Sequence, residues 1–150
     1  MHNAAMSGAN HRQLLWIEGT ASACQALACA LIQRIPPADV AWIDQSSIGK
    51  ARHLLGQSFQ VGIIDAHSGL DPDDLGVLTG TIIGGGYCLL LTPPADEWPA
   101  LADRAMTPLL SHGLELTDFR GFFVARLSKL LAQSPAVTRI DAVQASTACS

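Results

Sequence analysis

Five side chains with acid–base or hydrogen-bonding chemistry follow the apolar runs of this chain. They are Glu18, Asp44, Asp65, His67 and Thr92. In an open parallel sheet, ligands bind outside the carboxyl ends of the strands, at the point where the strand order reverses. Carboxylates, an imidazole and a hydroxyl gathered at that edge are the groups that a general acid–base site uses. We therefore take these five residues as the candidate site.

The same residue types also serve loops. Asp and Thr after a strand commonly accept hydrogen bonds from the backbone of their own loop, and Asp65, which precedes Ser68 and Gly69, is placed to do so. This structural interpretation is favoured, because loop residues of these types are so often caps. The catalytic interpretation stays open beside it.

Phosphate-binding loops are not predicted. A Walker loop needs GxxxxGK[ST] and a dinucleotide loop needs GxGxxG, whereas EGTASACQ after the first apolar run has neither lysine nor a second glycine. The glycines at 84–86 precede a strand, so we interpret them as a helix C-cap and turn. We expect no nucleotide cofactor for this segment itself.

A receiver domain would use Asp65 and Thr92 at these positions. Phosphorylation of an aspartate needs Mg²⁺ held by further acids after strand one, and a lysine that neutralises the phosphoryl group. Glu18 is the only acid there, and neither Lys50 nor Lys129 follows a late strand. We expect no working phosphoacceptor.

Metal ligands and catalytic cysteines are not predicted either. The four cysteines, at 24, 29, 88 and 149, match neither a zinc pair nor a disulfide framework. His53 and His67 lack further ligands at metal spacing. The thiols are interpreted as reduced and mostly buried, and we expect neither a metal nor a catalytic residue.

Composition indicates one folded domain with an apolar surface. The chain has 150 residues, 49% of them apolar and 15% charged, against about 25% charged in a typical domain. Such an apolar excess excludes disorder and favours contact with a partner. A net charge of −4 gives no general nucleic-acid footprint, so DNA is not expected. Arg120, Arg126 and Lys129 form one small basic cluster, the candidate RNA contact.

Localisation follows from what the sequence lacks. The first ten residues have no apolar core of signal-peptide length, and no window reaches 18 uninterrupted apolar residues. We expect a cytoplasmic protein that does not bind membranes.

Apolar runs predict four strands, at 13–19, 39–44, 60–66 and 87–94. Helical spacing predicts helices at 23–35, 46–57, 70–86 and 117–133, and a short fifth strand is expected around Leu114 to Leu116. Residues 1–10 are interpreted as a flexible leader, 11–133 as a single α/β domain and 134–150 as a linker-like tail.

Strands that alternate with helices predict a three-layer α/β sandwich with a mainly parallel sheet of four or five strands, flavodoxin-like or receiver-like. The simplest order is two-one-three-four. It places strands one and three, which are among the most apolar, in the centre.

Residues 51–99 resemble the N-terminal domain of the bacterial tRNA(Met) cytidine acetyltransferases of the TmcA type. The features are LLGQSF before the strand VGIIDA, the loop DAHSG, a helix containing LTGT, and GGGYCLLLTP followed by Glu97 and Trp98. QLLWIEG and FFVARLSKLLA are similar to the first strand and closing helix of that domain. The resemblance covers most of residues 12–132.

This resemblance implies a parent enzyme that uses acetyl-CoA, ATP and Mg²⁺ to form N(4)-acetylcytidine at the wobble position of tRNA(Met). It also implies neighbouring helicase-like and acetyltransferase domains, whose catalytic motifs have no counterpart in this sequence. We therefore expect a non-catalytic module, excised or stand-alone, that packs against those domains and helps to position tRNA. The alternatives are a stand-alone degenerate receiver-like signalling or protein-interaction domain, and a small flavodoxin-type enzyme.

Overall fold

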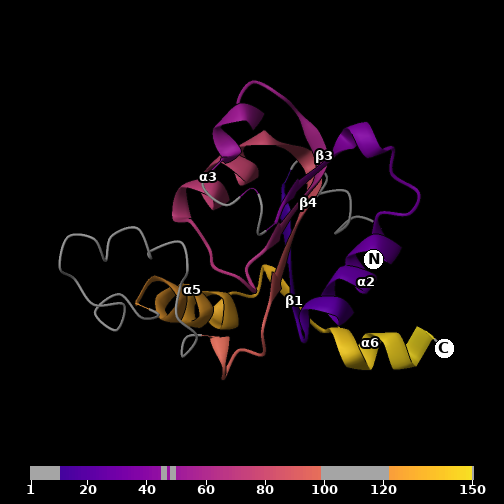
Figure 1. Cartoon of the computed structure of the whole chain (residues 1–150), viewed down its shortest axis with the longest axis vertical. Coiled ribbons are helices and arrows are strands. Elements are labelled where there is room, and N and C mark those ends of the chain that lie inside the picture. Colours follow the sequence, from indigo (N-terminus) through magenta and orange to yellow (C-terminus); the bar gives the residue numbers. More distant parts are fainter. Residues whose placement is uncertain (1–10, 45–46, 48–49, 99–121, 150) are drawn as a thin grey trace.

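The computed structural model describes residues 11–44, 47, 50–98 and 122–149, and Figure 1 shows them as a sheet with helices on both faces. The strands are β1 (Gln13–Glu18), β2 (Val40–Ile43), β3 (Phe59–Asp65), β4 (Ile82–Thr92) and β5 (Val137–Asp141). The α-helices are α2 (Ala21–Leu31), α3 (Pro72–Thr81), α5 (Phe122–Gln133) and α6 (Ala142–Cys149), and two short 3-10 turns are η1 (Pro37–Asp39) and η3 (Ala51–Leu54). No helix of this described part is long and apolar enough to cross a membrane.

All five strands are parallel, in the order β2-β3-β4-β1-β5. The predicted α/β sandwich with a parallel sheet is therefore confirmed. The predicted order two-one-three-four is wrong, because β2 pairs directly with β3 and β1 lies between β4 and β5. With 11 residues, β4 is the longest strand, and it occupies the centre of the sheet.

Side chains that alternate along each strand build a core on each face. Trp16 and Leu90 belong to the larger core, beneath α3 and α5, whereas Ile17 and Leu89 belong to the smaller core, beneath α2 and α6. This alternation is the period of two that a pleated strand imposes. Burial on both faces explains why β1, β3 and β4 appear as continuous apolar runs.

Two helices begin at a side-chain cap, each two residues from its predicted start. Thr20 Oγ1 accepts a hydrogen bond from Ala23 N at 3.2 Å at the start of α2. The Asp71 side chain accepts one from Asp73 N at 2.9 Å at the start of α3, with Pro72 at the first helical position. Each bond satisfies a backbone donor that the first helical turn leaves free.

The glycines at 84–86 lie inside β4 and not, as predicted, at a helix C-cap. The helix ends at Thr81 and the chain enters the strand directly. Beside these glycines the pairing of β3 with β4 shifts register between Phe59 and Val61. A Cβ on Gly86 would lie 2.5 Å from Gln60 O, so the close approach of the two backbones excludes a side chain there.

The expected linker-like tail at 134–150 is corrected by the structure. Residues 137–141 form β5, which pairs with β1, and α6 follows and contacts α2. The apolar signal was weak because β5 is a half-exposed edge strand with no fully buried side chain. The predicted leader at 1–10 and the predicted strand at 114–116 lie outside the described residues.

Candidate functional site

Four of the five candidate residues gather at the carboxyl edge of the sheet. Glu18 and Thr92 are register partners at the ends of β1 and β4, and Asp65 ends the neighbouring β3 with His67 just beyond it. Asp44 lies apart at the end of the outer strand β2, where it is exposed. Its carboxylate accepts a hydrogen bond from Ser47 Oγ at 3.3 Å, within its own loop.

The helices that follow β1 and β4 along the chain, α2 and α5, lie on opposite faces of the sheet (Figure 1). Since β1 and β4 are adjacent, their carboxyl ends form the switch point at which α/β proteins commonly bind ligands. Here Gly19 N donates a hydrogen bond to Thr92 O at 3.1 Å, which joins the two loops directly.

His67 bridges this switch point. Its Nδ1 lies 2.7 Å from Asp65 Oδ1, and its Nε2 lies 2.9 Å from the carbonyl oxygen of Gly19. The other carboxylate oxygen of Asp65 accepts a hydrogen bond from Gln25 Nε2 at 3.0 Å. The loop after β3 is thus fastened across the end of β4 to the loop after β1.

Both ring nitrogens of His67 face oxygen acceptors, which favours the doubly protonated imidazolium. Burial alone would lower the pKa of His67, but its contacts with Asp65, the Cys24 thiol and the Gly19 carbonyl raise that pKa to about 10. Burial alone would raise the pKa of Asp65, but hydrogen bonds from His67 and Gln25 bring it below the usual value. The two form an ion pair whose side chains are only 13% and 10% exposed.

Thr92 closes a second set of bonds at this edge. Its buried hydroxyl accepts a hydrogen bond from Trp16 Nε1 at 2.8 Å and donates one to Pro93 O at 2.8 Å. The Trp16 ring lies 6.0 Å from that of Trp98, centroid to centroid. Thr92 therefore links the central strand to the aromatic part of the core.

Glu18 is held from two sides. Its Oε1 accepts a hydrogen bond from Ala95 N at 2.8 Å, and its carboxylate pairs with the guanidinium of Arg139 on β5. That guanidinium carbon lies 4.6 Å from the Trp16 ring centroid, a cation–π contact. The hydrogen bond to Glu18 raises the pKa of Arg139.

A cavity of about 330 Å³ lies beside Glu18 and Asp141. Both carboxylates already have partners, because Asp141 Oδ1 caps α6 through the backbone amides of Val143 and Gln144 at 3.0 and 3.2 Å. In the described ranges no group of three His, Cys, Asp or Glu side chains could hold a metal ion. The arrangement fastens the loops after β1, β3 and β4 to one another.

Sequence reasoning missed the partners of the candidate residues. Arg139 lies in the segment interpreted as a linker, and Gln25 is an ordinary exposed helix residue. The one available signal was that Asp65 and His67, two residues apart, can meet as an Asx-type turn. Of the predicted RNA contacts, Arg126 and Lys129 are exposed on α5, whereas Arg120 lies outside the described residues.

Comparison with known proteins gives one consistent family. Residues 2–142 match the family model described as tRNA(Met) cytidine acetyltransferase TmcA, N-terminal. The chain is 32% identical over 146 residues to the enzyme of that name from Nitrosococcus halophilus, covering 92% of this chain and 20% of the relative. It is 34% identical over 92 residues to that from Haloferax volcanii (61% and 12%) and 33% identical over 99 residues to that from Salmonella typhimurium (61% and 15%). The chain thus spans a fifth or less of the length of these relatives.

Proposed function

The chain belongs to the family of N-terminal domains of tRNA(Met) cytidine acetyltransferase TmcA, and from this premise we propose that it is a non-catalytic module of such an enzyme. The module packs against the neighbouring helicase-like and acetyltransferase domains and helps to position tRNA(Met). The acetyl-CoA, ATP and Mg²⁺ that the resemblance implies are used by those domains, in the cytoplasm.

One observation carries the non-catalytic role: the polar side chains at the switch point are bound to one another. Asp65 and His67 pair together, Thr92 bonds Trp16, and the Glu18 carboxylate is shared between Ala95 N and Arg139. A general acid or base must present its reacting atom to the substrate. The hydrogen bonds of these groups instead join the loops after β1, β3 and β4 to one another.

The alternative function, a receiver-like domain that is phosphorylated on Asp65, has less support than the non-catalytic module. A receiver aspartate needs free carboxylate oxygens for Mg²⁺ and the incoming phosphoryl group. Both oxygens of Asp65 accept hydrogen bonds, one from His67 and one from Gln25.

A domain replacement tests the proposed role. In the Nitrosococcus halophilus enzyme, the region that this chain matches is replaced by this chain, and N(4)-acetylcytidine in tRNA(Met) is measured by mass spectrometry. We expect acetylation by the chimera, none by the isolated chain, and at least tenfold less by the enzyme without any such region. Acetylation by the isolated chain would contradict the non-catalytic role. A chimera no more active than the truncated enzyme would contradict the module's role altogether.

Positioning of tRNA is assigned to the exposed face of α5. Arg126 and Lys129 are three residues apart and therefore neighbours on one helix face. In the chimera, the double substitution Arg126→Gln and Lys129→Gln should raise the KM for tRNA a few-fold at unchanged kcat, because each lost phosphate contact weakens binding without touching the reaction. Arg34→Gln, an exposed arginine beyond α2, is the control. Equal KM values for both variants would remove tRNA contact from the proposal.

A further inference from the structure

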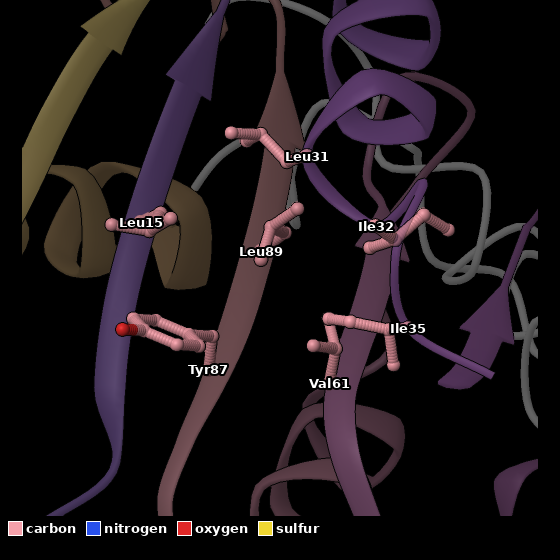
Figure 2. Close-up of a pocket in the computed structure, with 7 residues that line it drawn as sticks. All are labelled: Leu15, Leu31, Ile32, Ile35, Val61, Tyr87 and Leu89. Atoms are coloured by element: carbon pink, nitrogen blue, oxygen red, sulfur yellow. The ribbon is translucent and has the colours of Figure 1, made fainter. Parts of the chain in front are cut away.

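An apolar groove of about 330 Å³ lies on the α2 face of the sheet, towards the amino ends of the strands. Figure 2 shows Leu31, Ile32 and Ile35 from the end of α2 and the turn after it on one side. The strand residues opposite are Leu15, Tyr87 and Leu89, from β1 and β4. No charged side chain is among the described residues that line the groove.

The groove exists because α2 is too short for the strand it covers. Its 11 residues span about 16 Å at a rise of 1.5 Å per residue. The stretch of β4 from Ile82 to Leu91 pairs with the seven residues of β3, and it therefore spans about 23 Å at 3.3 Å per residue of β3. The other helix that packs on this face, α6, begins at the opposite end, where Ala142 approaches Gly19. In the part of the chain that the structure describes, the amino-terminal part of β4 therefore has no helix over it on this side.

Large apolar side chains are left in solvent as a result. Leu31 is 45% exposed and Tyr87 40% exposed, and Ile83 beyond them is 43% exposed. A smaller hollow of about 110 Å³ extends the groove along Ile35, Val61 and Tyr87 towards Ile83. Contiguous exposed apolar surface of this kind marks a binding site more often than isolated exposed residues do.

We propose that this groove seats an apolar segment of the catalytic part of a TmcA-type enzyme, the part that lies outside the region matched by this chain. The inference rests on the proposed function and specifies its interface. The Nitrosococcus halophilus relative has four-fifths of its length outside the match, which provides an occupant. The described chain also ends on this side of the sheet, since α6 packs against α2 (Figure 1).

The chemistry of the groove selects among occupants. An RNA backbone is bound by cationic side chains, and none of the described residues that line the groove has one. A protein segment with Leu, Ile, Val or Phe side chains would bury Leu31 and Tyr87 without leaving a charge unpaired. The larger hollow of about 500 Å³ beside α3 and α5 carries no such argument, because residues 99–121, which connect β4 to α5, lie outside the described residues.

Hydrogen exchange in the chimera tests the interface without using activity. The amides of Ile32 and Ile35, which bond Ala28 O and Ile32 O, close the exposed end of α2. We expect them to exchange at least tenfold more slowly in the chimera than in the isolated chain. Leu31→Lys should abolish this slowing, because a charge would enter the apolar contact. Leu55→Lys, a matched change at a 61% exposed leucine beside η3, should leave it intact.

The outcomes separate this inference from the proposed function. An acetylating chimera in which these amides exchange as fast as in the isolated chain overturns the groove and leaves the module's role standing. A chimera that does not acetylate but shows slowed exchange supports the groove interface and contradicts the module's role. A chimera that neither acetylates nor shows slowed exchange overturns both proposals. Slowing that Leu31→Lys fails to remove also overturns the groove. Slow exchange of these amides in the isolated chain also overturns the proposed occupant. If the slowing increases with protein concentration, a second copy covers the groove. If it does not depend on concentration, a segment of the same chain covers it.

Discussion

The carboxyl edge of the sheet and the groove beside α2 differ in whether their side chains are already bound within the chain. At the edge, the polar groups of Glu18, Asp65 and Thr92 are engaged by other parts of the same chain. In the groove, Leu31 and Tyr87 remain in solvent. The usual ligand position of an α/β sheet is therefore used for internal structure, and unused contact surface lies elsewhere.

This difference separates two kinds of energetic role. Substitutions at the edge should lower the free energy of unfolding, because they leave buried polar groups unpaired. Substitutions in the groove should affect association and spare stability, because the surface is already hydrated in the free module. Four measurements test this division.

The largest effect is expected at the ion pair of the edge. Asp65→Ala leaves the partly buried imidazolium of His67 without its counter-ion and Gln25 without its acceptor. The free energy of unfolding should fall by about 3 kcal/mol, as measured by urea denaturation near pH 7. Asp44→Ala, which removes an exposed carboxylate, is the control and should change little. Equal effects of both changes would mean that the edge is no better fastened than an exposed loop.

The pH dependence of stability gives the next test. Because the pKa of His67 in the folded state is raised from 6.5 to about 10, its stabilisation is complete below pH 6.5 and is lost as the pH rises towards 10. The lowered pKa of Asp65 gives a contribution that is lost as the pH falls below 3.8. Comparison of the wild type with His67→Gln between pH 6 and pH 10 should show a stability difference that shrinks towards pH 10. A constant difference would contradict the charged bridge.

A smaller loss is expected from Thr92→Val, which keeps the shape of the side chain and removes its hydroxyl. Trp16 Nε1 then lies buried without an acceptor, at a cost of about 2 kcal/mol in the free energy of unfolding. Thr138→Val on the edge strand β5, an exposed position, is the matched control. A neutral Thr92→Val would show that the aromatic link contributes nothing to the edge.

The smallest effect is expected in the groove. Leu31→Lys in the isolated chain should change the free energy of unfolding by less than about 0.5 kcal/mol, as surface substitutions usually do. Thermal or urea denaturation of the isolated variant measures it. A loss as large as that of Asp65→Ala would remove the division between the two regions, because Leu31 would then be part of the core.

Sequence reasoning reached the elements whose signal is local. The apolar runs of β1, β3 and β4 and the helical spacing of α2 and α3 depend on neighbouring residues alone. The gathering of Glu18, Asp65 and Thr92 followed from a general rule, since parallel strands end at a common edge.

The features that the sequence did not predict depend on contacts between residues that are distant in the sequence. The order of the strands is set by which backbones pair, and an apolar run does not specify its neighbour. Arg139 could not be assigned to Glu18 without knowing that β5 pairs with β1. The groove likewise arises from the unequal spans of α2 and β4, which become visible only once the two are packed together.

The position of β1 has a consequence for synthesis on the ribosome. Of the five strands that the structure describes, β1 is made before the others, yet its two neighbours are β4 and β5, which are made last. As β3 and β4 emerge, each can pair with the strand made just before it, whereas the apolar β1 has no partner until residue 87 and no second one until residue 137. At translation rates of about 5–20 residues per second, the amino-terminal strand waits on the order of ten seconds. During that interval it is the segment of the nascent chain that most needs shielding by a chaperone.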